Sequence, residues 1–224
     1  MKEVMRMKKI IKKLKKDWPI ISLMTLTLLI SIILYPKLPD RIPRHWNIKG
    51  EVDAYSGKLS GILSLNLMNI GFYFLFLILP NLDPKKENYE KFEPAYNIIR
   101  YTFHFFFITL QLITIFYSLG YKINIGSIVT LSVGIMFMLL GNQMGRIKHN
   151  YFVGIRTPWT LANEAVWTKT HRLSAPLWVA GGFIIAVLGF FSNNIAFVGI
   201  IIITIIISAI PIVYSYNLYK KIMK

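Results

Sequence analysis

Six long apolar runs constrain the fold of this chain more than any other feature of its sequence. They cover residues 19–35, 60–79, 101–119, 123–141, 174–191 and 195–216. Such runs approach the ~20 apolar residues that a helix needs to cross the ~30 Å hydrocarbon core of a bilayer. Each run must be helical, because hydrocarbon offers the backbone no other hydrogen-bond partner. The sequence therefore predicts an all-α polytopic membrane protein with six transmembrane helices.

The composition agrees with insertion in a membrane. Of the 224 residues, 54% are hydrophobic and only 16% are charged, and the mean hydropathy is +0.51. A soluble domain of this size would expose too much apolar surface at that composition. There are no cysteines, which excludes disulfides, thiolate metal sites and cysteine nucleophiles. We expect no cofactor.

The distribution of positive charge predicts the orientation of the helices. The formal net charge is +16, and most lysine and arginine residues fall in alternate segments between the apolar runs, both ends of the chain included. The positive-inside rule places those segments in the cytoplasm, so both termini are predicted to be cytoplasmic. Nucleic-acid binding is another source of a strongly basic balance. Membrane orientation explains it more economically, and we expect no direct binding of nucleic acid.

Residues 1–18 form a basic amphipathic segment. Apolar residues recur at helical spacing, with lysines on the other faces; they are Val4, Met7, Ile11, Leu14 and Trp18. A helix of this kind lies on an anionic leaflet, where each cation contributes about 1 kcal/mol. The alternative is a simple anchor that orients the first transmembrane helix.

The segment at residues 36–59 is the longest one predicted to lie outside the cell. Asn47 and Gly50 are turn formers, and Asp53 can accept backbone N–H bonds. The residues predict an ordered loop with an aromatic lid that includes Trp46 at the membrane interface. His45 and the neighbouring acids match no known metal-site spacing, so we expect no metal.

The segment at residues 142–173 is polar and is predicted to be cytoplasmic. Thr157 followed by Pro158 is typical of a helix start, which predicts a helix over 158–173 before Ser174 and Pro176 begin the fifth span. Arg156 lies just ahead of that helix, where unpaired N–H groups already favour an anion. The tryptophans of this segment suit the headgroup layer, so the alternatives are an interfacial helix and a specific binding site.

Glu164 and His171 are the acid and base of this segment. They are seven residues apart, about 10.5 Å along a helix, which is too far for the chelation that an i, i+4 pair allows. Acid–base chemistry would require both side chains to reach one substrate atom.

Two polar residues lie inside the predicted spans. Asn69 and Gln111 fall near the middle of the second and third spans. At equal depth their carboxamides would hydrogen-bond across the helices, with Asn66 joining them, for about 0.6 kcal/mol. A transporter would use such groups to line a path, but no acidic residue falls within any predicted span.

Two motifs resemble the bacterial SdpI family. The external motif resembles a small domain of unknown function often found at the start of these proteins, and it reads LPxxIPxHWNxxGxxD over residues 38–53. The cytoplasmic motif resembles the family signature and reads GIRTPWTL over residues 154–161, followed by VW at 166–167 and THR at 170–172. The resemblance implies a six-span protein of the bacterial cell membrane. It also implies immunity to a secreted toxic peptide and recruitment of a small cytoplasmic winged-helix repressor to the bilayer.

The resemblance also implies two contact sites and a division of the chain. The cytoplasmic partner site comprises Asn150, Gly154, Arg156, Thr157, Pro158, Trp159, Glu164, Trp167, His171 and Arg172. The extracytoplasmic toxin contact comprises Pro43, His45, Trp46, Asn47, Gly50 and Asp53. Residues 1–18 precede the first two helices at 19–80, with their loop at 36–59. An SdpI-like core at 81–224 holds four helices and the loop at 142–173.

Three functions remain open, in this order. The first is an immunity and sensing protein that confers toxin resistance and is not an enzyme. The second is a small transporter or efflux protein. The third is a membrane-embedded enzyme that uses Asn150, Arg156, Glu164 and His171.

Overall fold

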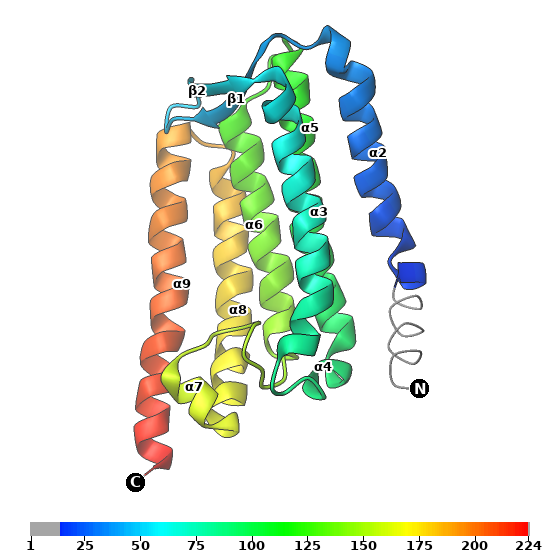
Figure 1. Ribbon diagram of the computed structural model, residues 1–224. Coiled ribbons are helices and arrows are strands. Elements are labelled where there is room, and N and C mark those ends of the chain that lie inside the picture. The colour runs from blue at the N-terminus through cyan, green and yellow to red at the C-terminus, as the bar shows by residue number, and fades with distance from the viewer. Residues whose placement is uncertain (1–13, 224) are drawn as a thin grey trace, which may run out of the picture.

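Six long apolar helices run along the length of the molecule (Figure 1). The computed structural model describes residues 14–223, so most of the predicted amphipathic segment at 1–18 lies outside the described residues. The six helices are α2 (Trp18–Leu34), α3 (Lys58–Leu82), α5 (Glu93–Ser118), α6 (Ile125–Met144), α8 (Glu164–Leu188) and α9 (Asn193–Ile222). The prediction of six membrane-spanning helices is confirmed. The orientation of the termini across the bilayer stays a prediction.

The chain is not purely helical, because the external segment predicted to be a loop is a β-hairpin. Strands β1 (Arg41–Trp46) and β2 (Val52–Gly57) pair antiparallel, and η1 (Tyr35–Lys37) links α2 to them. The hairpin lies across one end of the bundle (Figure 1). The register of the strand pairing shifts on both sides of His45. Short, irregular strands of this kind show only a weak alternation of apolar and polar residues, so the sequence pattern did not predict them.

The polar segment also differs from its prediction. Helix α7 (Pro158–Ala162) ends after one turn, and α8 then runs unbroken through Pro176. The predicted helix over 158–173 and the predicted restart at Ser174 are therefore wrong. Asn163 makes the break: its backbone is extended, and its side chain accepts hydrogen bonds from Ala165 N and Val166 N at the start of α8. A short helix, α4 (Asn88–Lys91), lies at the same end of the bundle.

Helices α6 and α8 touch through glycine. A Cβ on Gly182 would lie 2.6 Å from Gly134 O and 2.6 Å from Met138 N, and a Cβ on Gly134 would collide with Ala186 N. Two helices in lipid gain little from apolar burial, so close backbone approach at small residues drives their association. Glycine at these positions therefore sets the distance between α6 and α8.

A buried ion pair attaches the start of α2 to α5. Arg100 Nη2 lies 2.6 Å from Asp17 Oδ2, and the two side chains are 0% and 1% exposed. Tyr73 and Tyr101 donate their hydroxyls to the same carboxylate at 3.1 and 2.8 Å. Sequence reasoning missed this contact, because Asp17 precedes the first span and Arg100 precedes the predicted start of the third.

The intramembrane polar groups pair differently from the prediction. Asn69 hydrogen-bonds His104 at 2.7 Å. Gln111 instead donates to Ser31 Oγ and Ile62 O, both at 3.2 Å, and Asn66 donates to the same Ser31 at 3.1 Å. The predicted Asn69–Gln111 bond is wrong because each carboxamide finds a partner at its own depth. These groups join α2, α3 and α5 to one another.

The glycine contact predicts a position-specific loss of stability. In Gly182→Ala the new methyl group meets backbone atoms of α6, so we expect the free energy of unfolding to fall by about 1–3 kcal/mol. The control is Gly71→Ala on α3, where a Cβ meets nothing within 4 Å, so helix propensity alone should maintain or raise stability. Thermal unfolding of the detergent-solubilised protein, followed by circular dichroism, measures both. Equal melting temperatures for the two variants would contradict the packing argument.

Candidate functional site

The two predicted contact sites lie at opposite ends of the bundle (Figure 1). One is the linker, residues 145–163, which joins α6 to α8 and contains α7. The other is the hairpin of β1 and β2 together with a cavity beneath it. Helices α6, α8 and α9 extend between these two ends.

Trp167, in the first turn of α8, is the residue on which the linker packs. Its side chain is fully buried, and its Nε1–H donates to Ile147 O at 2.9 Å. The indole stacks on His171 with 4.1 Å between ring centroids and lies 5.0 Å from the His149 ring. The headgroup position predicted for this tryptophan is wrong, because the linker folds over it.

His171 connects α8 to the motif that precedes α7. Its Nδ1–H donates to Trp167 O at 2.8 Å, which leaves Nε2 to accept the N–H of Ile155 at 2.9 Å. Gly154 has φ +114°, and a Cβ there would collide with His171 Nε2. Only glycine fits a backbone that is both left-handed and this close to an imidazole.

Asn150 organises the first half of the linker. Its side chain is fully buried, and its Nδ2 donates to Lys148 O at 2.8 Å and to Val153 O at 2.9 Å. Its Oδ1 accepts from Phe152 N and Val153 N at 2.9 and 2.7 Å. One carboxamide therefore satisfies four backbone groups of an irregular segment.

Helix α7 is attached to α9. Thr157 and Thr160 form a capping box at the start of α7. Thr157 Oγ1 lies 3.1 Å from Ser215 Oγ of α9, and the Trp159 ring lies 5.0 Å from the Tyr216 ring. The helix start predicted at Thr157 and Pro158 is confirmed, although the helix is short.

Sequence reasoning missed three residues that hold the linker against the α3–α4 connection. Asp83 is buried and accepts from Tyr89 Oη at 3.1 Å and from Tyr151 N at 2.8 Å. Burial, and after it the Asp83 carboxylate, raises the pKa of Tyr89. Lys85 Nζ lies 2.8 Å from His149 Nδ1. An acid placed directly after a transmembrane helix was the signal that could have indicated this contact.

Burial and, after it, the neighbouring Lys85 favour the neutral form of His149. Burial of the imidazole, and after it the Lys85 ammonium, lowers the pKa of His149 below its ordinary value. The neutral ring then accepts the hydrogen bond from the ammonium at Nδ1. The pair is therefore one partly exposed cation and one buried neutral acceptor.

The remaining residues of the predicted cytoplasmic partner site are wholly or partly exposed. Arg156, Pro158, Glu164 and Arg172 are exposed, and Gly154 and Trp159 are partly exposed. Arg156 Nη1 donates to Tyr151 O at 3.0 Å, which orients its guanidinium. Glu164 is exposed whereas His171 is buried, and within residues 14–223 no hydrogen bond joins these two side chains, which the enzyme alternative requires to act together. This part of the chain also holds no group of three or more histidine or acidic side chains that suits a metal. The exposed cations of the linker and of the start of α8 are Arg146, Lys148, Arg156, Lys169 and Arg172.

The hairpin brings four of its six predicted residues to one cavity. His45, Trp46, Asn47 and Gly50 line it. Pro43 is buried in β1, and Asp53 lies beside His45 with 2.6 Å between Oδ1 and Nδ1. The Asn47 side chain accepts from Lys49 N and Glu51 N at 2.9 and 3.1 Å, and Gly50 has φ +80°. The turn between the strands is therefore closed by its own hydrogen bonds.

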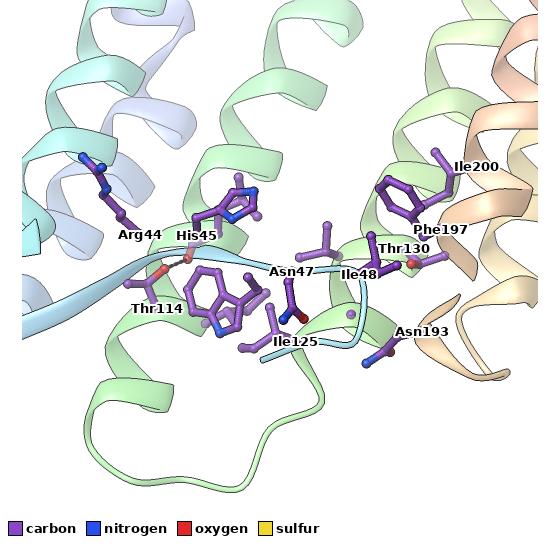
Figure 2. Close-up of a pocket in the computed structure, with 16 residues that line it drawn as sticks. Arg44, His45, Asn47, Ile48, Thr114, Ile125, Thr130, Asn193, Phe197 and Ile200 are labelled. Carbon is purple, nitrogen blue, oxygen red and sulfur yellow. Dashed lines mark hydrogen bonds between the residues drawn. The ribbon is translucent and has the colours of Figure 1, made fainter. Parts of the chain in front are cut away.

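The cavity beneath the hairpin has a volume of about 310 Å³. Its walls come from α5, α6 and α9 as well as from the hairpin. Figure 2 shows Arg44 and His45 at one end of it and Phe197, Ile200 and Asn193 at the other. Asn193 Nδ2 donates to Lys49 O at 2.9 Å, which connects the start of α9 to the hairpin turn.

Comparison with known proteins gives matches to both ends of the chain. Residues 146–215 match the SdpI/YfhL protein family, and residues 23–70 match a domain of unknown function, DUF1648. The Immunity protein SdpI of Bacillus subtilis (strain 168) is 34% identical over 209 residues, which cover 93% of this chain and 98% of the relative. No solved structure matches the chain.

The contacts of Asn150 predict the effect of an isosteric change. Asn150→Asp removes the donor to two buried carbonyl groups and buries a carboxylate, so we expect stability to fall by about 1–3 kcal/mol for each carbonyl left unpaired. Asn217→Asp, at an exposed position of α9, is the matched control. Thermal unfolding measures stability, and tryptic cleavage after Lys148 reports opening of the linker. An Asn150→Asp protein that behaves like the control would refute the role given to this side chain.

Proposed function

The chain belongs to the SdpI/YfhL family, and on this premise we propose that it is a membrane immunity protein that protects its cell against a secreted toxic peptide. The observation that carries the proposal is the 34% identity to Immunity protein SdpI, which extends over 93% of this chain and 98% of the relative. The family resemblance predicted from two motifs is confirmed. Protection and the choice of toxin are the proposed part.

We place the toxin contact at the hairpin and its cavity. A secreted peptide reaches the cell from outside, and the hairpin is the largest structured segment on the side predicted to be external. Trp46, Asn47 and Gly50 line a concave site with walls from three helices, which is the form that ligand sites take. Pro43 and Asp53 position the strand and His45 instead of lining the cavity.

We place a cytoplasmic repressor contact on the outer surface of the linker. The exposed cations, among them Arg156 and Arg172, suit an acidic surface on a partner. Asn150, Thr157, Trp167 and His171 are buried, so their proposed role is to shape that surface. The proposal depends on this end of the molecule facing the cytoplasm, as the distribution of positive charge predicts.

Helix α9 gives a physical basis for communication between the two sites. Asn193 at its start hydrogen-bonds the hairpin turn at Lys49 O. Near its end, Ser215 contacts Thr157, and Tyr216 contacts Trp159. A shift of α9 that accompanies toxin binding would therefore act directly on α7.

A challenge with the cell's own secreted products tests immunity. A strain that lacks the gene is exposed to medium conditioned by its parent strain, with and without the gene on a plasmid. We expect growth to stop in the deletion strain and to recover with the plasmid. In a second arm, the same plasmid is placed in a Bacillus subtilis strain that lacks SdpI, and that strain is exposed to medium from its SdpI-bearing parent. If the deletion strain grows normally in its parent's medium, the immunity function is rejected.

Recruitment of the repressor tests the linker surface. A fluorescent fusion of the proposed small winged-helix repressor is followed by microscopy after conditioned medium is added. We expect the parent protein to draw the fusion to the membrane, and Arg156→Ala with Arg172→Ala to reduce membrane fluorescence several-fold because the cationic surface is lost. Asn217→Ala is the control for an exposed change on α9. Recruitment by the double variant at the parent level would show that the partner binds elsewhere.

A further inference from the structure

We propose that the cavity beneath the hairpin binds an apolar segment of the toxic peptide through one peptide group, and that the hairpin turn is its movable cover. This inference rests on the proposed function. It adds the chemistry of the ligand and the route by which the ligand enters the cavity. It concerns the space between the hairpin and the ends of α5, α6 and α9 (Figure 2).

The size and the walls of the cavity suit apolar side chains. A cavity of about 150 Å³ holds one benzene molecule, and the volume here is about 310 Å³. Its walls include Ile113, Val129, Phe197 and Ile200 from three helices and Ile48 from the turn. Ile48 and Phe197 are 49% and 45% exposed, so apolar surface continues from the cavity to the outside of the molecule.

Two polar atoms of cavity-lining residues distinguish a peptide from an acyl chain. Trp46 Nε1–H and Asn193 Oδ1 are buried and have no hydrogen-bond partner among residues 14–223. The orientation of the Asn193 amide is defined, because its Nδ2 donates to Lys49 O. One atom is a donor and the other an acceptor, and a peptide group offers the complement of both. An acyl chain offers neither, and a phosphate offers acceptors alone.

The turn contacts the Asn193 side chain, which carries one of these two atoms. A Cβ on Gly50 of the turn or on Gly126 of α6 would collide with that side chain, so the amide lies in a slot between two glycines. Asn47 closes the turn internally, which allows the turn to move as one unit. Because the unpaired atoms are shielded from solvent, a peptide reaches them when the turn lifts. The hydrogen bonds that the peptide then makes with these two atoms offset the loss of the hydrogen bond between Asn193 and Lys49.

The first experiment fills the cavity. Val129→Trp places a large ring in the cavity, whereas Ile135→Trp adds the same ring at an exposed position of the same helix. We expect Val129→Trp to lower the tolerated dose of conditioned medium at least tenfold and Ile135→Trp to leave it unchanged. Trp46→Phe keeps a ring beside Tyr117 but removes the indole N–H, and we expect it to lower the dose several-fold. Membrane levels and melting temperatures of all variants are measured alongside, and equal protection by Val129→Trp and Ile135→Trp would overturn the proposal.

The second experiment identifies the occupant. A benzoylphenylalanine at Val129 or at Tyr55, an exposed hairpin residue, is irradiated in intact cells during exposure to conditioned medium, and adducts are analysed by mass spectrometry. A peptide adduct at Val129 that is absent at Tyr55 supports the site. A lipid adduct at Val129, a peptide adduct at Tyr55 alone, or no adduct while the cells remain protected would reject this site and leave the immunity function standing. Loss of protection by the parent protein itself would instead reject the function.

Discussion

The close contact between α6 and α8 fixes the distance between two helices that extend from one predicted contact site to the other. Gly134 and Gly182 let the helices approach so closely that an added Cβ would collide with the backbone of the partner helix. In lipid such close packing replaces the hydrophobic drive that joins helices in water. Helix α6 begins at Ile125 in the wall of the cavity and ends at Met144, which packs in the cluster around Trp167. One helix pair therefore positions parts of both sites.

Helix α9 packs beside this pair in a different way. Its side chains are mostly exposed along its length, and its specific polar contacts are concentrated near its ends. Asn193 contacts the hairpin turn, and Ser215 contacts the cap of α7. Because the middle of α9 rests on apolar contacts such as Ile207 against Gly181, small movements along it break few hydrogen bonds. Helix α9 is therefore suited to transmit a movement of the hairpin turn at its start to α7 near its end.

The polar groups follow the rule that hydrocarbon supplies no partner. Asp17 and Arg100 neutralise each other at the start of α2, and Asn150 satisfies four backbone groups in the linker. Eight buried side-chain atoms have no hydrogen-bond partner within residues 14–223, and two of them, Trp46 Nε1 and Asn193 Oδ1, belong to residues that line the cavity. An unpaired buried polar group is costly, so a cavity whose lining residues carry an unpaired donor and an unpaired acceptor is a place to expect a ligand.

The amino-acid sequence by itself determined the six spans, the helix start at Thr157 and the family, because run length, capping residues and linear motifs are local properties. It did not determine that the segment at residues 36–59 pairs as strands, that Asn163 separates α7 from α8, or that Gln111 bonds Ser31 instead of Asn69. These outcomes depend on which residues of distant segments arrive at the same depth. The candidate site divides in the same way: the motifs named Trp46 and Trp167, but only the tertiary structure placed one beside a cavity and the other in a buried core. Burial and partner choice depend on packing between helices, which no single stretch of sequence contains.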